Sequence, residues 1–561
     1  MIILGVTHPI SENNGACLLV NGRLVAMAEE ERFIRIKFAP RIFPEQAIKF
    51  CLRHAGITLE DIDYIAVGFD GIFKSVIPNF TGQPLFFGIL AAGYFSARVT
   101  ANMFRMPGYV YRKSHDFVNH HISHANAAFY CSGFDHANII SLDGSGGRNA
   151  GFIGYGEGEK IGIFHEISNS DSWGHMYSNI TRLLGFKPHA DEYKVMGLAS
   201  FGSPDPRGLP FIDWEKQIPR INRSEYRKYS KWARSVIDPG NPMGKNSQDI
   251  AATTQASFEK SVFRMLEWVV EKNKSRNLCV SGGSALNCSM NGKLSASGLI
   301  DDIYIHPASW DSGTALGGAI QVYIDKKGKT PDVGFAHPYW GPEYSDKEVE
   351  SAILKFKTAR YRYVENICEE TAKILSENKI VGWFQGRMEV GPRALGNRSI
   401  LGNPQFPEMK DAINLKVKGR EPWRPFAPAI LEEYAHHYLE NHRDSPYMAL
   451  TFKINPSKIS DIISATHVDG TARPQTVSKA GNPMFWRLID EFRKRAGVPA
   501  LLNTSFNLSD EPIVCRPEEA LRTFYRCGMD CLVMGRYIVE KTEEDYKVDS
   551  IPPKYGERRG R

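Results

Sequence analysis

The stretch Val118-Asn119-His120-His121-Ile122-Ser123-His124 decides how the first half of this chain is interpreted. His120 and His124 stand four residues apart, so on a helix both imidazole rings project from one face and can bind one metal ion. Residues 125–130 continue a helical period, and residues 138–144 are typical of a buried strand that ends in Asp143. Two helix imidazoles beside a strand-end carboxylate predict a three-ligand metal site. The spacing alone is equally compatible with two histidines that lie at the surface or cap the helix.

Length and charge set the first limits on fold and function. A chain of 561 residues exceeds what one hydrophobic core usually serves, so two or more domains are expected. A hydrophobic content of 42% and a charged content of 24% are ordinary for a globular protein. The net charge is +6, but four cations against one carboxylate in residues 554–561 supply +3 of it. The folded part is therefore close to neutral, which argues against a dedicated nucleic-acid surface.

The chain shows no signal of export or membrane insertion. Residues 1–6 form a short apolar strand without a basic n-region, and residues 84–97 are too short and too glycine-broken to span a bilayer. The nine cysteines are scattered, and the closest pair, Cys527 and Cys531, lacks zinc-ribbon spacing. These features predict a cytoplasmic protein with reduced cysteines and no membrane association.

The first 70 residues predict antiparallel strands followed by a helix and a further strand. Residues 2–7 and 15–30 are apolar runs, and Asn21-Gly22 within the second run is a strong hairpin signal. A loop from His8 to Gly15 joins the first two strands. This layout resembles the phosphate-side hairpin of actin-like and sugar-kinase-like ATPase folds. A helix over residues 44–55 and a strand over 65–69 follow.

For three segments of the first half, a structural interpretation is favoured over a functional one. The charged run Glu29-Glu30-Glu31-Arg32, with Arg35 and Lys37, is interpreted as a solvated turn. Residues 79–111, rich in Phe, Tyr, Met and Gly, are assigned mainly to the core, with an acceptor pocket as the alternative. Residues 204–247, which are polar, basic and punctuated by proline, are interpreted as a surface insertion before a long helix over 247–272.

A glycine turn and a further strand–helix unit complete the first half. Residues 278–287 (LCVSGGSALN) predict a strand, a glycine turn and a helix start, whose backbone amides can hold a phosphate. Residues 303–307 predict another strand. Asp311 then either caps the following helix or completes the metal site.

Five motifs in one order give the first half a family resemblance: Asn-His-His-x-x-His-Ala, strand-Asp143-Gly, Glu-Tyr-Lys-Val-Met-Gly-Leu-Ala, Ser-Gly-Gly-x-Ala-Leu-Asn and Pro-Ala-x-x-Asp-Ser-Gly. The chain resembles the NodU/CmcH family of O-carbamoyltransferases. The resemblance implies Fe²⁺ or another divalent metal on His120, His124, Asp143 and Asp311. It places a carbamoyl-adenylate near Gly144, Gly282, Gly283 and Asn287. It also implies that His8 is the base for the acceptor hydroxyl and that Lys37 and Glu192 face the acceptor.

The second half is expected to begin after a turn-rich linker over residues 326–346. Its richest stretch, residues 382–400 (GWFQGRMEVGPRALGNRSI), places Arg387, Arg393 and Arg398 in a loop after a strand. Planar guanidinium groups suit phosphate oxygens, so the stretch predicts a phosphate site, with salt bridges inside the domain as the alternative. Residues 467–475 form a polar cluster, and residues 498–507 a buried strand. A nucleophilic Ser505 is disfavoured, because no Gly-x-Ser-x-Gly elbow surrounds it.

The same resemblance covers these stretches and implies an α/β protein of two domains. An actin-like and sugar-kinase-like (ASKHA) ATPase-type domain over residues 1–340 would transfer the carbamoyl group, and a YrdC-like domain over residues 346–561 would form carbamoyl-adenylate. Contacts to carbamoyl phosphate and ATP, with Mg²⁺, are implied for Arg393, Lys418, Arg424, Arg473, Asn503 and Ser505. Residues 71–112 and 204–247 depart from the family pattern, so the acceptor is expected only to be a hydroxyl-bearing small molecule, as in antibiotic and other natural-product biosynthesis.

The resemblance therefore predicts an ATP-dependent O-carbamoyltransferase, and other functions stay open beside it. A threonylcarbamoyl-type tRNA-modifying transferase would need a tRNA surface. A sugar or acid kinase would leave the arginine-rich second half without a role. A non-catalytic binding protein is disfavoured, because clustered charges are costly to keep for structure alone. The sequence does not reveal the oligomeric state, and a homodimer is one option.

Overall fold

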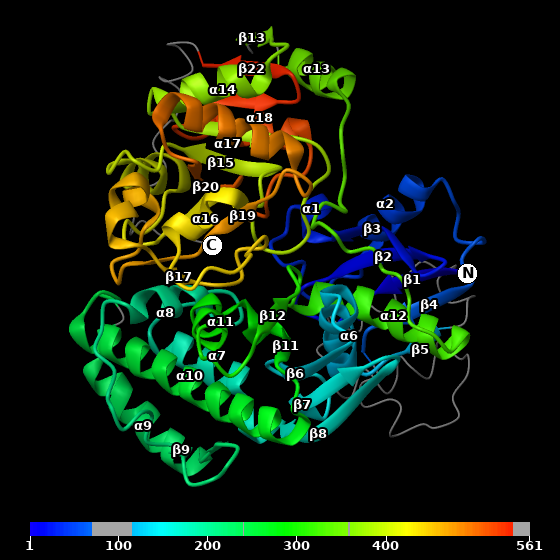
Figure 1. The fold of residues 1–561 in the computed structure, drawn as a ribbon, viewed down its shortest axis with the longest axis vertical. Helices are drawn as coiled ribbons and strands as arrows, with labels where there is room; N and C mark the ends of the chain where they lie inside the picture. Colours follow the sequence, from blue (N-terminus) through cyan, green and yellow to red (C-terminus); the bar gives the residue numbers. More distant parts are fainter. Residues whose placement is uncertain (70–114, 239, 357–359, 542–561) are drawn as a thin grey trace. The chain divides into compact units, whose positions relative to one another are not determined.

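A computed structural model describes residues 1–69, 115–238, 240–356 and 360–541 (Figure 1). The chain divides into two compact units, the first formed by residues 1–34 and 38–335 and the second by residues 35–37 and 336–561. The segment 79–111, which was assigned mainly to the core, lies outside the described residues.

The first unit contains two five-stranded sheets with the same strand order. The first sheet runs β3-β2-β1-β4-β5, with β1 to β3 antiparallel and β1, β4 and β5 parallel. The second runs β8-β7-β6-β11-β12 and repeats the same directions. This duplicated order is the layout of actin-like and sugar-kinase-like ATPases, as predicted. The strands are β1 (Ile2–Val6), β2 (Gly15–Val20), β3 (Arg23–Glu29), β4 (Tyr64–Val67), β5 (His115–Phe117), β6 (His136–Leu142), β7 (Asn149–Glu157), β8 (Lys160–Ser168), β11 (Asn277–Ser281) and β12 (Asp302–Ile305).

Local chemistry explains how the first sheet is built. Asn21 and Gly22 turn β2 into β3 with φ of 52° and 87°, the left-handed pair that a type I′ turn requires, so the predicted hairpin is confirmed. An added Cβ on Gly5 would lie 2.1 Å from the carbonyl oxygen of Ala315, so this glycine lets helix α12 (Thr314–Lys327) pack directly on β1. The predicted helix over 44–55 is α2 (Glu45–Ala55), whose apolar face closes the core below the sheet.

The remaining helices of the first unit pack between the two sheets or on their outer faces. Helix α6 (His120–Ser132) packs against α12, where Gly317 permits the contact because an added Cβ would meet the oxygen of Ser123 at 1.7 Å. Helix α10 (Lys245–Asn273) packs on β6 and β7. The predicted insertion contains β9 (Ile212–Asp213), β10 (Arg220–Ile221) and α9 (Arg223–Val236). The other helices are α1 (Glu31–Ile34), α7 (Trp173–Leu183), α8 (Glu192–Ala199) and α11 (Cys288–Ser295).

The prediction of a solvated turn at the charged run is wrong for residues 29–32. Their exposed fractions are 2% for Glu29, 1% for Glu30, 4% for Glu31 and 2% for Arg32. Arg32 Nη1 lies 2.8 Å from Glu31 Oε1, and Glu30 accepts the N–H of Ala47 at 2.8 Å. Buried charges persist only where such partners exist. The amides that bind Glu30 come from α2, so composition could not reveal them.

The second unit is organised on an eight-stranded mixed sheet of order β13-β22-β21-β14-β15-β20-β16-β19. Helices cover both faces. Phe384, Leu502 and Leu532 point to the side covered by α13 and α18, whereas Trp383, Leu501 and Val533 point to the side of α14 and α17. The strands are β13 (Arg360–Tyr363), β14 (Val381–Phe384), β15 (Arg398–Gly402), β16 (Ala427–Leu431), β19 (Gln475–Val477), β20 (Ala500–Ser505), β21 (Cys531–Met534) and β22 (Tyr537–Glu540). The helices are α13 (Asp346–Lys355), α14 (Ile367–Ser376), α15 (Met409–Ala412), α16 (Glu432–Tyr438), α17 (Pro483–Ala496) and α18 (Pro517–Tyr525), and β17 (Phe452–Lys453) pairs with β18 (Thr471–Ala472).

Within the described ranges, no helix combines the length and the apolar character needed to cross a bilayer.

Candidate functional site

Helix α6 presents two histidines to the interior of the first unit. The side chain of Asn119 caps the helix by accepting the N–H of Ile122 at 3.0 Å, which sets where the helix begins. His120 and His124 are then one turn apart, with ring centroids 4.6 Å apart and Nε2 atoms 3.1 Å apart. Both rings are buried. The predicted helical placement of the two imidazoles is confirmed.

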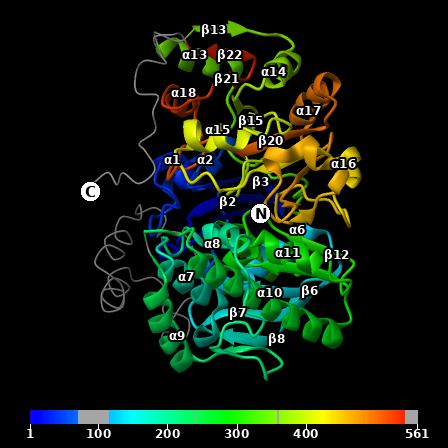
Figure 2. The same cartoon turned by 90° about the vertical axis from the view of Figure 1, so that its left-hand side faces the viewer.

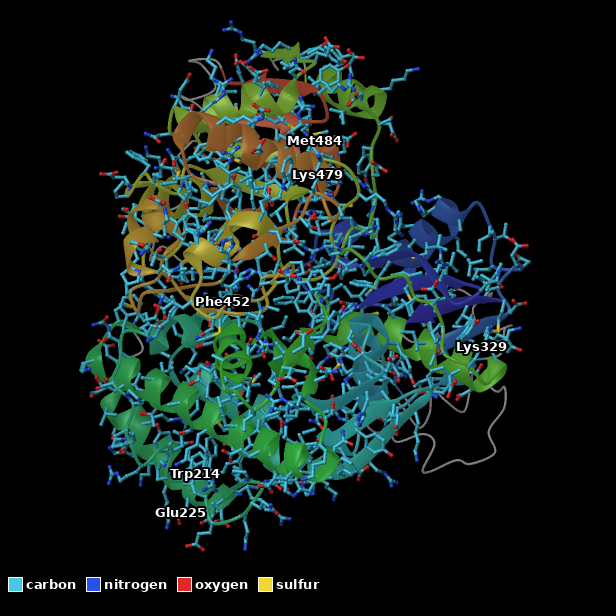
Figure 3. All side chains as sticks on the ribbon, in the orientation of Figure 1. Trp214, Glu225, Lys329, Phe452, Lys479 and Met484 are labelled. Carbon is cyan, nitrogen blue, oxygen red and sulfur yellow. The ribbon has the colours of Figure 1, made fainter. Side chains whose placement is uncertain are left out.

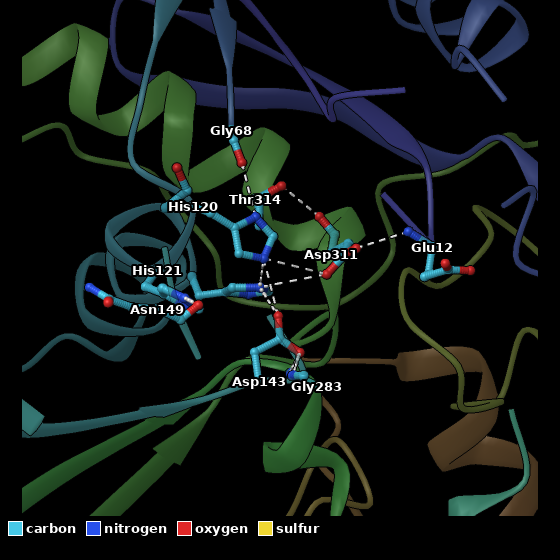
Figure 4. A network of polar contacts seen from close by, with 12 residues as sticks. Glu12, Gly68, His120, His121, Asp143, Asn149, Gly283, Asp311 and Thr314 are labelled. Atoms are coloured by element: carbon cyan, nitrogen blue, oxygen red, sulfur yellow. Dashed lines mark hydrogen bonds and ion pairs between the residues drawn. The ribbon is translucent and has the colours of Figure 1, made fainter. Parts of the chain in front are cut away.

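Two carboxylates complete a cluster around these nitrogens (Figure 4). Asp143, which follows β6, places Oδ2 at 3.1 Å from His120 Nε2 and 3.2 Å from His124 Nε2. Asp311 opens a short 3₁₀ turn before α12, and its Oδ1 lies 3.7 Å from each of the same nitrogens. All four ligand atoms lie within 4.8 Å of one another. The side chain of Asp311 therefore joins the cluster and does not cap the following helix.

The electrostatics of the cluster favour a cation at its centre. Burial alone would lower the pKa of His124, but hydrogen bonds to Asp143 and Asp311 outweigh burial and raise its pKa to about 9. Burial opposes ionisation of Asp143 too, yet the two imidazoles hold its pKa well below the usual range. His120 Nδ1 lies 3.3 Å from the carbonyl of Gly68, to which it donates, so its Nε2 lone pair faces the carboxylates. Two imidazole nitrogens and two carboxylate oxygens are a donor set that fits a divalent transition metal.

A glycine loop lets the surrounding backbone approach the cluster. An added Cβ on Gly146 would lie 2.4 Å from the ring of His120, and one on Gly282 would lie 2.2 Å from the oxygen of Leu142. The N–H groups of Gly144 and Gly283 donate to Oδ1 of Asp143 at 2.8 and 3.3 Å. The glycines predicted to lie at an adenylate are thus adjacent to the candidate metal-ligand cluster.

Asn287 and Glu192 are engaged with protein groups. Asn287 caps α11 by accepting the N–H of Met290 at 3.0 Å, and its amide pairs with that of Gln255 at 2.9 Å. Glu192 accepts hydrogen bonds from the hydroxyl of Ser178 at 2.5 Å and the N–H of His189 at 2.7 Å. Both side chains are held in place by the fold.

His8 lies in the β1–β2 loop and is buried against Phe69, with ring centroids 5.1 Å apart. Phe69 in turn contacts the ring of His120 edge-on at 5.5 Å. Burial, followed by the nearby His120, lowers the pKa of His8 to about 4, so its ring is neutral at pH 7. Its Nδ1 accepts the N–H of Ile10 at 3.3 Å. His8 can therefore accept a proton at Nδ1 once that long hydrogen bond is exchanged.

The loop of His8 is supported by a strained segment that sequence analysis missed. Arg35, Phe38, Ala39 and Arg41 all have φ between 46° and 68°, a region that non-glycine residues avoid unless the surroundings impose it. Asn14 Nδ2 donates to the oxygen of Ala39 at 3.0 Å, and the N–H of Phe38 donates to the buried carboxylate of Glu31. The buried charged run therefore holds a loop next to the candidate base.

In the second unit, the predicted phosphate contact Lys418 is buried, with 3% of its surface exposed. Its Nζ donates to Oδ1 of Asn507 at 2.8 Å and also contacts the backbone oxygen of Ser505. Burial, followed by Arg420 and Arg424, holds the pKa of Lys418 well below its ordinary value. Asn507, at the end of the predicted strand, was not among the expected contacts.

A second group of predicted contacts lies along the same sheet. Asn503 Nδ2 donates to Oε1 of Gln475 at 3.1 Å and to the oxygen of Ala394 at 3.3 Å, beside Arg393. Arg473 is two residues from Gln475 and is half-buried. Strand β20 carries both Asn503 and Ser505, so it links this group to Lys418.

Two of the predicted phosphate contacts are engaged by backbone carbonyls. Arg398 has no exposed surface, and its guanidinium donates to the oxygens of Gln385 (2.6 Å), Asn397 (2.9 Å) and Pro342 (3.2 Å). Arg387 donates to the oxygens of Trp340 and Gly341 at 2.6 and 3.2 Å. These contacts hold the loop that carries Arg393, and the roles of Arg387 and Arg398 at a phosphate stay predictions.

Comparison with known proteins identifies the family to which the chain belongs. A family model described as Carbamoyltransferase N-terminus matches residues 96–320, and one described as Carbamoyltransferase C-terminus matches residues 372–541. Nodulation protein NolNO of Sinorhizobium fredii is 37% identical over 96% of this chain and 82% of its own length. Nodulation protein NolO of Bradyrhizobium diazoefficiens is 37% identical over 76% of this chain and 79% of its own length. A crystal structure of full-length HypF in the phosphate- and nucleotide-bound form aligns at a TM-score of 0.39 and 11% identity over 58% of this chain and 56% of that chain, a level that carries no functional weight.

The identity to NolNO over nearly the full length, together with the two family matches, shows that the chain is an enzyme of the carbamoyltransferase family.

Proposed function

We propose that this carbamoyltransferase is ATP-dependent and transfers the carbamoyl group to a hydroxyl of a small molecule in two stages. In the second unit, carbamoyl phosphate reacts with water to give carbamate and phosphate, and a carbamate oxygen attacks the α-phosphorus of ATP. Pyrophosphate leaves, and carbamoyl-adenylate remains. In the first unit, the acceptor hydroxyl attacks the carbamoyl carbon, its proton passes to a base, and AMP leaves.

The cations of the second unit support the first stage. Bringing carbamoyl phosphate beside ATP places two polyanions together, so fixed positive groups must offset their repulsion. Arg393, Arg424 and Arg473 supply guanidinium groups, and Lys418 adds an ammonium group positioned by Asn507 and Ser505. Asn503 and Ser505 would supply neutral hydrogen bonds, and Mg²⁺ would accompany ATP.

The cluster of the first unit supports the second stage. His120, His124, Asp143 and Asp311 would hold a divalent metal, which when bound would supply Lewis-acid polarisation of the carbamoyl carbonyl. His8, neutral at pH 7, would take the proton of the acceptor hydroxyl. The glycines Gly144, Gly282 and Gly283 would let the adenylate approach the cluster closely, with Asn287 behind them. The nitrogen and oxygen donors suit Fe²⁺ or another divalent metal.

The observation that carries this proposal is the hydrogen bond from the N–H of Glu12 to Oδ2 of Asp311, at 3.0 Å. It joins the loop of the candidate base to a candidate metal ligand. An acceptor hydroxyl that reaches the cluster would therefore meet a base whose position is fixed relative to it. The acceptor contacts inferred from resemblance, Lys37 and Glu192, remain part of the proposal.

The two stages can be tested separately. Stage one is measured as carbamoyl-phosphate-dependent exchange of labelled pyrophosphate into ATP, and stage two as a mass gain of one carbamoyl group across a panel of hydroxyl compounds. Arg393→Ala should abolish the exchange, whereas His120→Ala should leave it intact and stop the transfer. Exchange that persists unchanged in Arg393→Ala refutes the phosphate assignment. Loss of both activities in His120→Ala would identify a structural histidine instead.

The alternatives differ in their products. A sugar or acid kinase would release ADP, whereas the proposed reaction releases AMP and pyrophosphate. A threonylcarbamoyl-type transferase would add a larger group to tRNA, which mass analysis of the nucleosides separates from carbamoylation.

A further inference from the structure

The outer face of α9 concentrates positive charge. Residues 216–235 contain seven Lys and Arg against one Glu, a net +6 that equals the formal net charge of the whole chain. All five cations of α9 itself are exposed: Arg223, Arg227, Lys228, Lys231 and Arg234. Figures 1 and 2 both place α9 at the periphery of the first unit, and Figure 3 shows Glu225 at its outer edge. The near-neutral average of the folded chain therefore conceals a local basic surface.

Cations on two other surface helices are paired with carboxylates. On α17, Arg493 and Lys494 lie 2.8 and 2.9 Å from Asp490. On α2, Lys49 lies 2.6 Å from Glu45. On α9, Lys228 pairs with Glu225 at 2.7 Å, and Arg223, Arg227, Lys231 and Arg234 have no ion pair among the described residues. Unpaired cations on neighbouring turns repel one another, so this face is not an ordinary solvated helix surface.

The apolar face of α9 is already used by the protein. Tyr229 and Ala233 are 8% and 0% exposed, and Phe211 packs on Tyr229 with ring centroids 5.2 Å apart. Trp232 lies at the flank, 51% exposed, with its ring 5.3 Å from that of Tyr229. The helix thus offers a cationic centre and a single indole at its margin.

This arrangement distinguishes between two anionic partners. A bilayer surface is bound by a helix whose apolar face enters the lipid, and here that face is turned into the protein. A phosphodiester strand needs a row of cations and an aromatic ring on which a base can stack. Arg223, Arg227 and Lys231 follow one another at intervals of four residues, roughly 6 Å along the helix axis. Such a row suits successive phosphates of an extended strand.

We propose that the outer face of α9 binds the phosphate backbone of a single-stranded nucleic acid, with Trp232 stacking on a base. The surface is separate from the residues assigned to carbamoyl transfer, so the two proposals succeed or fail independently. This binding should have no sequence preference, because cations contact the phosphate backbone and an aromatic ring can stack on any base.

The test uses the full chain and a fluorescent 12-nucleotide single-stranded RNA of mixed sequence. Anisotropy measured over a series of KCl concentrations should show binding that weakens with salt. Arg227→Gln/Lys231→Gln should reduce the magnitude of the slope of log K against log salt by about 1.4, since each lost phosphate contact contributes about 0.7 for single strands. Trp232→Ala should weaken binding by about ten-fold at every salt concentration and leave the slope unchanged.

Arg493→Gln/Lys494→Gln is the matched control, because it removes two cations that are already paired on α17. It should leave affinity and slope as in the wild type, and thermal melts should show all variants folded. Absence of RNA binding, or binding that Arg227→Gln/Lys231→Gln does not change, would overturn the proposal. So would tighter binding to phosphatidylserine vesicles than to RNA with the same dependence on Arg227 and Lys231, since the partner would then be a lipid surface.

Discussion

The N–H of Glu12 donates to Oδ2 of Asp311 at 3.0 Å, although the two residues are 299 positions apart in the chain. Oδ1 of the same carboxylate faces His120 and His124 at 3.7 Å. One side chain therefore holds the loop of His8 with one oxygen and faces the candidate metal position with the other. Its two functions can be separated by mutation.

Asp311→Asn should lose metal while keeping the loop in place. The amide oxygen of Asn can still accept the N–H of Glu12, but the charge that helps bind a divalent cation is gone. We expect affinity for the metal to fall by about 100-fold or more, judging from the 10- to 100-fold cost of losing even an outer-shell partner. Elemental analysis after dialysis against metal-limited buffer measures this. Asp325→Asn, an exposed change on α12, should keep the wild-type content, and full metal content in Asp311→Asn would exclude Asp311 as a ligand.

Glu31→Gln should loosen the strained segment that follows it. The substitution keeps an acceptor for Phe38 but removes the charge that pairs with buried Arg32, a loss of roughly 3 kcal/mol by analogy with other broken buried pairs. Trypsin should then cleave at Arg35, Lys37 or Arg41 faster than in the wild type, as followed by mass spectrometry of the fragments.

Glu45→Gln provides the comparison for Glu31, because Glu45 forms an exposed pair with Lys49 that is worth under about 1 kcal/mol. Its cleavage pattern should match the wild type. An unchanged pattern in Glu31→Gln as well would mean that the segment is held by its own backbone contacts alone.

Local signals were sufficient for much of the fold. Asn21-Gly22 predicted its hairpin from turn chemistry, and the apolar periods predicted α2 and α10 to within a few residues. Residues 29–32 were misread, because four consecutive charges look solvated until Gln46 and Ala47 supply the amides that bind Glu30. Residues so distant in sequence become partners only in the folded chain.

The candidate site, too, could be predicted from the sequence only in part. Helical spacing placed His120 and His124 together, and the strand-end position placed Asp143 beside them. For Asp311 the pattern left open a helix cap or a fourth ligand, and the resemblance implied the ligand. In the arginine-rich stretch, however, the sequence alone did not reveal that the guanidinium of Arg398 donates to three backbone carbonyls of the folded chain. Arginines in one loop have the same chemistry, so only the contacts made in the folded chain distinguish their roles.

Lys418 should take up a proton when phosphate binds. Burial and the adjacent Arg420 and Arg424 hold its pKa well below the ordinary value, and an incoming polyanion opposes both effects and raises it again. Titration calorimetry of ATP binding in two buffers of different ionisation enthalpy should therefore report net proton uptake, and Lys418→Met should remove it. Lys416→Met, an exposed neighbour, should retain the uptake. Identical proton uptake in wild type and Lys418→Met would show that ATP binding does not change the protonation of Lys418.

His306 should make the first unit sensitive to acid. Its ring is 1% exposed, Nδ1 accepts the N–H of Ala308 at 3.1 Å, and Nε2 has no partner among the described residues. Burial lowers its pKa to about 3, whereas the unfolded chain titrates near 6.5, so the unfolded state binds the extra proton between these values. Above about pH 6.5, His306 is neutral in both states and the free energy of unfolding does not depend on its titration. As the pH falls from 6.5 toward 3, the free energy of unfolding decreases by up to about 1.4 kcal/mol per pH unit. His306→Asn keeps an acceptor for Ala308 and removes the titration. Urea midpoints at pH 7 and pH 5 should therefore draw closer together in His306→Asn than in the wild type, and an equal shift in both proteins would show that His306 is accessible to protons in the folded state.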